Sequence, residues 1–305
     1  MWHRLLACAG CAKMHGIRNS GITLWLVVFA SLHSALGQST TAPGTQPSTQ
    51  PWTQVGTIDA PEIPESSGIV ESRKYPGVFW THNDSGNPPE IFAITRQGKL
   101  INKFSIRATN VDWEDIASDD SGHLYLADIG NNNRNRTQVQ VYRVAEPDPR
   151  VRGNALVPDQ TFQLRYPGRP FDAESLFFVD DDAYIIEKDL TFRAPGVYRF
   201  HLKTTGTIQT LEKVMDLPWL TPVTASDVSR DQKYFAMMSL TGPAIFQIDG
   251  DIANLKRGPI WTAGLVDPNI EAITFVSDGI LATTEGRRVI FFPFRPPAPT
   301  SRPVK

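Results

Sequence analysis

Short apolar runs bounded by turn residues follow one another along most of the chain, and five of them begin alike. In each of the five, a polar pair stands directly before the apolar residues: SSGIVES (66–72), WEDIASDD (113–120), DAESLFFVDD (172–181), ASDVSRD (225–231) and IEAITFVSD (270–278). Further runs rich in Val, Ile, Phe, Tyr and Thr follow each one, which is typical of β-strands joined by turns. No stretch of about 12 residues has a helical period. The pattern predicts an all-β chain.

The repeats predict a five-bladed β-propeller of four-stranded meander blades. They recur about every 45–60 residues, and a repeat of that length is typical of stacked or radial folds. Four strands can be read in each of the first four units, whereas the fifth unit ends after three. The segment TQVGTIDA (53–60) precedes the first unit, so we expect this N-terminal strand to complete the last blade. A two-sheet sandwich is the alternative, but it gives no reason for five matched beginnings.

The two ends of the chain have compositions that differ from the rest. Residues 1–37 combine early basic residues, an apolar stretch and a small-residue cleavage site, which predicts a signal peptide and a secreted or periplasmic protein. Met14 is an alternative start. A membrane anchor is the alternative for the apolar stretch at 22–35, which is short for a span. The predicted disordered linker, propeller and disordered tail are residues 38–52, 53–295 and 296–305.

Composition and charge narrow the range of partners. The chain is 41% hydrophobic and 20% charged, which fits a globular protein, and its net charge is −2. Removing the predicted signal peptide takes away three basic residues and leaves 27 basic and 32 acidic side chains, a net charge of −5. This balance argues against a nucleic acid polymer or an anionic membrane as partner, and we expect a monomer without a membrane span. Both cysteines, Cys8 and Cys11, precede Met14, so the mature protein has no thiol chemistry.

A polar residue recurs at the matched position of the five repeats. These residues are Ser67, Glu114, Glu174, Ser226 and Glu271. A radial arrangement would direct them to one axis, where three carboxylates repel one another unless a cation or shared protons offset the charge. Oxygen ligands without Cys or His favour a hard cation, and Ca²⁺ accepts such a set with variable geometry. The sequence therefore predicts an axial calcium site. Hydrogen bonds from these side chains to neighbouring backbone groups are the alternative.

A second polar set lies where the second strand of each blade is predicted to end. Antiparallel pairing brings these ends to the face on which the first strands begin. The predicted catalytic residues are a general base at Asp84, Asp128 or Glu187, with Lys188 to stabilise developing charge. The predicted substrate-binding residues are His82, Asn83, Asn131, Arg134 and Arg287, although an ordinary turn also explains the run at 82–86. Asp112 and Asp172 each stand two residues before a matched glutamate, either orienting metal ligands or forming turns.

These motifs carry two resemblances. The order Ser, Glu, Glu, Ser, Glu, with WEDIASDDSGHLYLADIG and DAESLFFVDDDAYIIEKD as the best stretches, resembles five-bladed calcium-activated nucleotidases of the apyrase type. That resemblance implies that the five residues ring a Ca²⁺ ion, with nucleoside di- or triphosphates hydrolysed beside it. The motifs ESSG, HNDSG, DWEDIA, DIGxN and YRVxEP are similar to those of a group of secreted bacterial propellers, which implies no settled activity.

Three functions are compatible with these residues. A Ca²⁺-dependent hydrolase of phosphate esters or anhydrides would use the metal to polarise substrate oxygens and activate water. A propeller lactonase or arylesterase would use the same metal on a different substrate. A non-catalytic propeller would keep calcium for structure and bind a protein or a glycan. The sequence has no GxSxG, P-loop, HExxH or GxGxxG motif, so covalent nucleophilic catalysis is not indicated.

Overall fold

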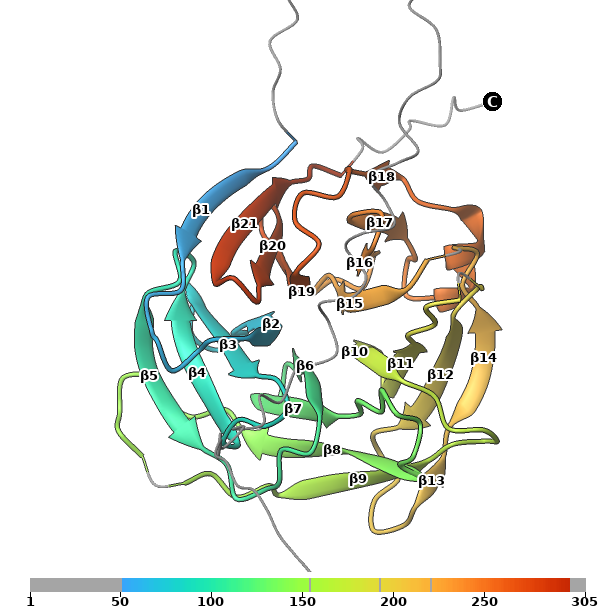
Figure 1. Ribbon diagram of the computed structural model, residues 1–305, viewed down its shortest axis with the longest axis horizontal. Coiled ribbons are helices and arrows are strands. Elements are labelled where there is room, and N and C mark those ends of the chain that lie inside the picture. The colour runs from blue at the N-terminus through green and yellow to red at the C-terminus, as the bar shows by residue number, and fades with distance from the viewer. Residues whose placement is uncertain (1–50, 154, 192, 220, 297–305) are drawn as a thin grey trace, which may run out of the picture. The chain divides into compact units, whose positions relative to one another are not determined.

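The computed structural model describes residues 51–296 apart from 154, 192 and 220, and these residues form a ring of five β-sheets (Figure 1). The predicted signal peptide lies outside the described residues, as do most of the predicted linker and most of the predicted tail. Among the residues that the structure does describe, no helix is both long and apolar enough to cross a membrane.

Each sheet is one blade of a propeller, and its first strand lies nearest the centre of the ring (Figure 1). Blade 1 consists of β2 (Ser66–Glu71), β3 (Val78–Asn83), β4 (Glu90–Thr95) and β5 (Leu100–Ser105). Blade 2 consists of β6 (Trp113–Ser118), β7 (His123–Asp128), β8 (Gln138–Ala145) and β9 (Gln160–Arg165), with β13 (Gln209–Thr210) added in parallel at its outer edge. Blade 3 consists of β10 (Ala173–Val179), β11 (Asp182–Glu187), β12 (Gly196–His201) and β14 (Glu212–Asp216).

The last two blades show how the ring closes. Blade 4 consists of β15 (Val223–Val228), β16 (Tyr234–Ser239), β17 (Ala244–Gln247) and β18 (Trp261–Thr262). The 3₁₀-helix η1 (Ile252–Arg257) lies in the connection from β17 to β18. Blade 5 consists of β19 (Ile270–Val276), β20 (Gly279–Thr284), β21 (Arg288–Pro293) and β1 (Thr53–Thr57). Strand β1 pairs with β21 in antiparallel register, so the prediction that an N-terminal strand completes the last blade is confirmed.

The core is divided among the seams between neighbouring blades. Each of five buried apolar clusters draws residues from two adjacent blades: for example, Trp80 and Trp113 fill the seam between blades 1 and 2. Burial of an aromatic side chain of this size stabilises a fold by about 1.5–3 kcal/mol or more. Because each blade packs against a neighbour on both of its faces, successive residues of a strand are buried on alternate faces. This explains the continuous apolar runs in the sequence.

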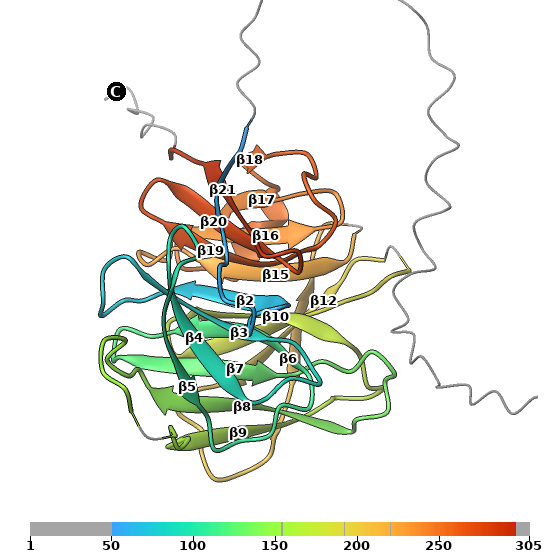
Figure 2. The ribbon, with the colours of Figure 1, turned by 60° about the vertical axis from the view of Figure 1, so that its left-hand side comes forward.

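The five innermost strands contact one another in a closed cycle around the axis, and Figure 2 shows them together across the centre of the ring. Each innermost strand pairs with the second strand of its own blade. The register of this pairing shifts near the second residue of the innermost strand, as a β-bulge produces. The residues at that position are Ser67, Glu114, Glu174, Thr224 and Glu271. A bulged residue is left outside the ladder and redirects its side chain. The bulges therefore bring one matched side chain per blade to the beginning of the innermost strands.

Candidate metal centre

Three carboxylates meet at the beginning of the innermost strands. Asp84 follows β3, Asp112 precedes β6 and Glu114 is the bulged residue of β6. One oxygen from each lies within 4.8 Å of the oxygens of the other two. Two oxygens bound to one Ca²⁺ ion at about 2.4 Å lie at most about 4.8 Å apart, so the spacing matches a shared hard cation. We call Asp84, Asp112 and Glu114 the carboxylate trio.

The backbone around Asp112 and Asp84 fixes two members of the trio. The Asp112 backbone N–H donates to Asp128 Oδ1 at 3.0 Å, and its carbonyl accepts from the Gly130 N–H at 3.1 Å. The Asp84 backbone N–H donates to the Glu65 carbonyl at 3.3 Å, while the Asp84 carbonyl accepts from Asn110 Nδ2 at 3.0 Å. These contacts join the loops of blades 1 and 2 and hold the carboxylates in place.

Gly130 makes room for the trio. A Cβ atom at this position would overlap Glu114 Oε1 and Asp112 Oδ2, so only glycine permits the two carboxylates to approach this backbone. Arg136 fixes the same loop, because its guanidinium donates to the Gly130 carbonyl at 2.7 Å and to the Asp128 carbonyl at 3.0 Å. The close approach is therefore built into the fold by a loop of blade 2.

The trio has more negative charge than its surroundings neutralise. Glu114 is only 5% exposed, and within the described part of the chain no donor forms a hydrogen bond with its carboxylate. Burial raises the pKa of Glu114 well above its usual range, and Asp84 and Asp112 raise it further. Burial, followed by the charge of Asp84, also raises the pKa of Asp112 to about 6. A buried carboxylate without a donor is the expected state of a ligand whose partner is a cation.

A second acidic group faces the same end of the innermost strands. Glu174 Oε1 forms an ion pair with Lys188 Nζ, whereas Glu174 Oε2 is buried and has no hydrogen-bond partner among the described residues. Glu271 is half-buried, and burial raises its pKa to about 7, with the Lys188 charge acting in the opposite direction. Burial raises the pKa of Glu285, as it does that of Glu114, and the Lys188 charge opposes both shifts, so Lys188 acts on carboxylates from blades 2, 3 and 5.

Three predicted metal ligands, Glu114, Glu174 and Glu271, lie at the same end of the innermost strands, as do the predicted catalytic residues Asp84 and Lys188. Of the three glutamates, Glu114 alone belongs to the carboxylate trio, where it meets Asp84. Ser67 is 7% exposed and its hydroxyl donates to the Glu114 carbonyl at 3.4 Å, which links blades 1 and 2.

The predicted equivalence of Ser226 is wrong, because the register places Thr224 at the matched position of β15. Ser226 is the fourth residue of its strand, where the other blades have Ile69, Ile116, Leu176 and Ile273. Those four side chains are buried in the apolar seams between blades. Ser226 takes such a core position, and its buried hydroxyl has no partner among the described residues.

Two predicted catalytic acids have other surroundings. Asp128 is fully buried; its Oδ1 pairs with Arg136 and accepts from Asp112 N, and its Oδ2 accepts from Gln140 at 3.0 Å. Glu187 ends β11, and its charge acts on Tyr198 and Lys213 of the outer strands. Asp128 thus orients the trio, and Glu187 lies among outer-strand residues rather than with Lys188.

The predicted substrate-binding residues divide into buried supports and turn residues. Three of them are almost fully buried and bond to nearby loops: His82, Asn83 and Asn131. His82 Nδ1 lies 3.0 Å from the Asn83 carbonyl, Asn83 Nδ2 donates to the Glu62 carbonyl at 2.9 Å, and Asn131 Nδ2 donates to Tyr166 at 3.1 Å. Arg134 and Arg287 are half-exposed in turns with φ of 53° and 62°. The arginines are therefore the accessible members of this set.

Two aspartates at the blade seams, the buried Asp115 and the half-buried Asp227, were not among the predicted residues. Asp115 accepts from the Ile116 N–H at 2.8 Å and from the Leu176 N–H of the next blade at 2.7 Å. Asp227 accepts from the Val228 N–H at 2.7 Å and from the Phe275 N–H at 2.8 Å, again across a seam. The acids in WED and ASD were the available sequence signal, but part of each one's hydrogen bonding comes from a distant segment, Leu176 for Asp115 and Phe275 for Asp227.

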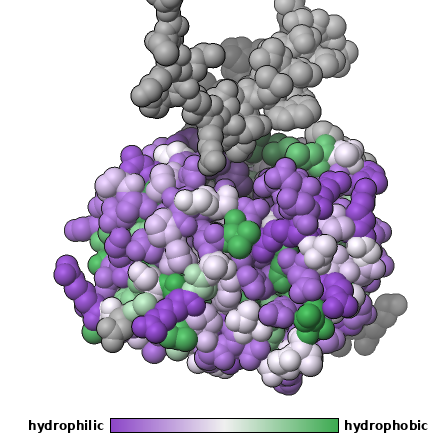
Figure 3. All heavy atoms as spheres, turned by 60° about the horizontal axis from the view of Figure 1, so that its bottom comes forward, coloured by the Kyte–Doolittle hydropathy of each residue, from purple (hydrophilic) through white to green (hydrophobic). Residues whose placement is uncertain are grey.

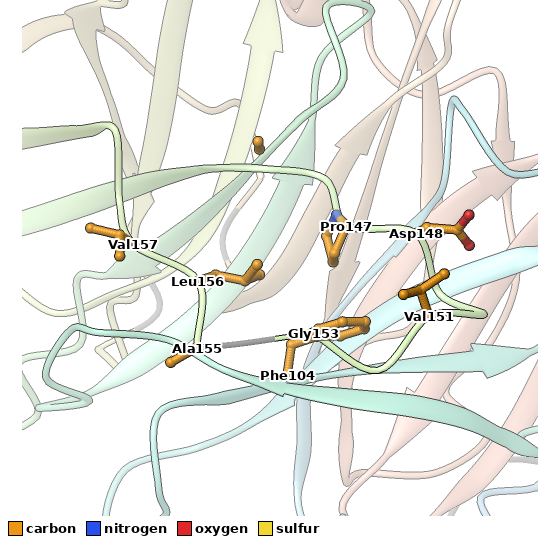
Figure 4. A pocket seen from close by; sticks show the side chains of 9 residues that line it. Phe104, Pro147, Asp148, Val151, Gly153, Ala155, Leu156 and Val157 are labelled. Atoms are coloured by element: carbon orange, nitrogen blue, oxygen red, sulfur yellow. The ribbon is translucent and has the colours of Figure 1, made fainter.

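Among the described residues, no other group of three Asp, Glu or His side chains brings its ligand atoms as close together as the trio does. An apolar hollow of about 500 Å³ lies beside β5 and the segment that follows β8, lined by Phe104, Pro147, Val151 and Leu156 among others (Figure 4). No member of the trio contributes to it. The face shown in Figure 3 is mostly hydrophilic, with hydrophobic residues scattered across it. The carboxylate trio is therefore the strongest candidate for a cation-binding site among the described residues.

Comparison with known proteins finds only distant structural likenesses. No family model and no curated protein matches the chain. Among solved structures, U3-55K is 11% identical over 75% of this chain and 68% of its own, with a TM-score of 0.40. The WD40 repeats of RRP9 are 12% identical over 75% of this chain and 80% of theirs, with a TM-score of 0.42. A Thermus thermophilus protein described as a putative oxidoreductase (glucose dehydrogenase) is 10% identical over 79% of this chain and 98% of its own, with a TM-score of 0.43.

Proposed function

We propose that this protein binds a divalent cation, with Ca²⁺ as the preferred ion, and hydrolyses a phosphate ester or anhydride beside it. The carboxylate trio carries the proposal, because its oxygens lie within 4.8 Å of one another and Glu114 is buried without a donor. All three ligands are hard oxygens, which favour Ca²⁺ or Mg²⁺ over softer metals. Ca²⁺ accepts irregular carboxylate geometry more readily than Mg²⁺, which demands a strict octahedron.

The exposure of the trio favours a catalytic over a purely structural ion. Asp84 and Asp112 are half-exposed, whereas Glu114 is buried. Three protein ligands supply fewer than the roughly 6–8 oxygens that Ca²⁺ takes, so water or substrate would complete the shell from the solvent side. Metal sites that keep open positions are typical of catalysis, and fully protein-ligated sites are typical of structure.

The residues beside the trio suit hydrolysis. A bound cation would polarise a phosphoryl oxygen and lower the pKa of a coordinated water. Glu271 and Glu285 are half-buried carboxylates near Lys188 and are candidates to accept a proton from that water. Lys188 provides an ammonium to offset negative charge on a substrate, and the half-exposed Arg287, in the same turn as Glu285, is a further candidate for that role. The predicted signal peptide would deliver the protein to a compartment outside the cytoplasm.

An activity panel with the full-length protein tests this proposal. Phosphate monoesters and diesters, nucleoside diphosphates, lactones and aryl esters would be assayed in excess EDTA and then with CaCl₂, MgCl₂ or MnCl₂. We expect calcium-dependent hydrolysis of a phosphate substrate that Glu114→Gln reduces at least about 100-fold. The matched control is Asp120→Asn, an exposed aspartate at the opposite end of β6.

Each other outcome decides against part of the proposal. Hydrolysis confined to lactones or aryl esters would replace the phosphate substrate by a carboxylic ester at the same metal site. Calcium binding without hydrolysis of any panel member would overturn the catalytic role and favour a binding propeller with structural calcium. Hydrolysis that survives in Glu114→Gln would remove the trio from the mechanism.

A further inference from the structure

His82 is a fully buried polar residue at the seam between blades 1 and 2, shortly before the trio residue Asp84 in the sequence. It belongs to β3, where it pairs with Gly68 of β2, and it is 0% exposed. Its Nδ1 lies 3.0 Å from the Asn83 carbonyl, but its Nε2 is buried and has no hydrogen-bond partner in the described part of the chain. A buried polar atom without a partner destabilises a fold, so packing alone would favour an apolar side chain at this position.

Strands β2, β3 and β6 meet at this imidazole. A Cβ atom at Gly68 of β2 would lie 2.6 Å from His82 Nε2 and 2.8 Å from the backbone nitrogen of Ile116 in β6, so the ring fits into the seam because residue 68 is glycine. The ring centroid of Trp113 in β6 lies 5.7 Å from that of His82, at an interplanar angle of 87°. This is the edge-to-face geometry that aromatic rings prefer. The imidazole therefore packs against residues of both blades.

The imidazole contacts the two chain segments that carry the trio. The Asn83 carbonyl, next to His82 Nδ1, directly precedes Asp84, and Trp113 stands between the other two trio members in the sequence. Asn110 joins the same two segments, because its Nδ2 donates to the Asp84 carbonyl at 3.0 Å and its Oδ1 accepts from the Trp113 N–H at 3.0 Å. Within the described residues, His82 forms no hydrogen bond with a trio carboxylate, so any effect on the trio passes through these segments.

We infer that His82 is a positioning residue, which sets the separation between Asp84 and the other two trio members and keeps the three carboxylates within reach of one cation. It fixes the Asp84 segment at the Asn83 carbonyl and the other segment at the Trp113 ring. Residues that hold metal ligands in place typically change metal affinity by about 10–100-fold when they are removed. The role rests on the proposed function and deepens it, since it adds a residue that shapes the cation site without binding the ion.

Calcium affinity and metal-free stability together separate positioning from packing. Calorimetric titration with CaCl₂ and denaturation in EDTA would compare the full-length native protein with His82→Leu, His82→Gln and His82→Asn. His82→Leu fills the seam without a ring nitrogen, so it should bind Ca²⁺ about 10–100-fold more weakly while its metal-free stability stays at or above the native value. His82→Gln places its amide near Nε2 instead of Nδ1 and should weaken binding likewise. His82→Asn keeps an amide N–H in the place of Nδ1 and should stay near the native affinity.

Ile91→Ala is the matched control for packing. Ile91 pairs with His82 across β3 and β4, is equally buried, and belongs to the same apolar seam, but it lies in neither trio segment. Its truncation should lower the metal-free melting temperature and leave the calcium affinity at the native value. An equal loss of affinity in Ile91→Ala and His82→Leu would overturn the role, because general packing of the seam would then be what holds the trio.

Crystal structures of the native protein and of His82→Leu in EDTA add a measurement that needs no bound ion. We expect the trio oxygens within 4.8 Å of one another in the native protein and Asp84 displaced from the other two in the variant. Native calcium affinity in His82→Leu, or an unchanged trio in its crystals, would overturn the role of His82 and leave the cation site intact. No calcium binding by the native protein would overturn the proposed function, and the trio spacing in the two crystals would still decide for or against His82.

Discussion

The seams between blades and the beginnings of the innermost strands both bury carboxylates, yet they give them different partners. Glu114 and Asp115 are consecutive in β6, with 5% and 2% of their surface exposed. Asp115 accepts backbone N–H groups from its own strand and from β10 of the next blade. Glu114 accepts no hydrogen bond within the described residues, and its carboxylate lies with Asp84 and Asp112. The fold supplies hydrogen-bond donors to Asp115, whereas the Glu114 carboxylate is available to bind a cation.

The far end of the innermost strands strengthens this comparison. Asp120 pairs with Arg73 at 3.3 Å and with Arg230 at 3.1 Å, so acids there meet basic side chains directly. At the beginning of the strands, several carboxylates share the single ammonium of Lys188. Among the described residues, several carboxylates therefore share one ammonium at the beginning of the innermost strands, and that end is where a cation is expected.

Removing a seam aspartate should have the largest effect. Asp115→Ala leaves the Ile116 and Leu176 N–H groups buried without an acceptor, at a cost of about 1–3 kcal/mol for each. We expect the free energy of unfolding to fall by about 2–5 kcal/mol, equally in EDTA and in calcium. Chemical denaturation in both conditions measures it. A loss of less than about 1 kcal/mol would show that these bonds do not hold blades 2 and 3 together.

Changes to the trio should weaken metal binding and leave the seams intact. Asp112→Asn removes one charged ligand, and Gly130→Ala forces the Glu114 and Asp112 carboxylates apart. Each should lower calcium affinity at least about 100-fold, or about 2.7 kcal/mol, with less change in metal-free stability. Calorimetric titration with CaCl₂ measures this, with Asp120→Asn as the control. Native affinity in both variants would place the ion elsewhere.

The acidic end should make stability depend on pH in the absence of metal. Burial raises the pKa of Asp112 to about 6 and that of Glu271 to about 7, above their unfolded values. The folded chain therefore holds protons that the unfolded chain releases, so the free energy of unfolding in EDTA falls as pH rises from about 4 to 7. After discounting for solvent screening we expect a fall of about 2 kcal/mol.

Calcium should counteract this trend, because it binds only the deprotonated carboxylates and its affinity rises over the same pH range. Denaturation at a series of pH values, with and without CaCl₂, measures both slopes. A metal-free stability that rises steadily toward pH 7 would contradict the assigned pKa directions of the axial acids.

The smallest effect is expected at Ser226. Its hydroxyl is buried in the seam between blades 3 and 4 without a partner among the described residues, so Ser226→Ala removes an unsatisfied polar group. We expect a gain of about 0–1 kcal/mol in stability and an unchanged calcium affinity. A loss of calcium affinity in Ser226→Ala would support the original prediction that Ser226 is a metal ligand.

The fold was predictable because it rests on repetition that the sequence displays directly. Five matched beginnings and one orphan strand define the blades and their closure, and the pairing of β1 with β21 follows from counting strands. The register within the innermost strands was not predictable in the same way. A β-bulge adds a residue without any mark in the sequence, and both Thr224 and Ser226 offered a hydroxyl in β15.

The candidate site was predictable in part. Glu114 and Asp84 were found from repeat position and loop composition, and Asp112 was recognised as a neighbour of the ligands. The roles of Lys188, Gly130 and Asp115 depend on contacts between segments far apart in sequence. Alternation along β11 could have separated Glu187 from Lys188, since successive side chains leave a strand on opposite faces.

The most direct test of the account is the melting temperature of the full-length protein in excess EDTA and then in millimolar CaCl₂, for the native chain and for Glu114→Gln. An ion present at about 100 times its Kd adds about 2.7 kcal/mol, which raises the melting temperature of a domain of this size by several degrees. The account predicts such a rise in the native protein and its loss in Glu114→Gln. No rise with Ca²⁺, Mg²⁺ or Mn²⁺, or an equal rise in both proteins, would contradict a metal centre at the carboxylate trio.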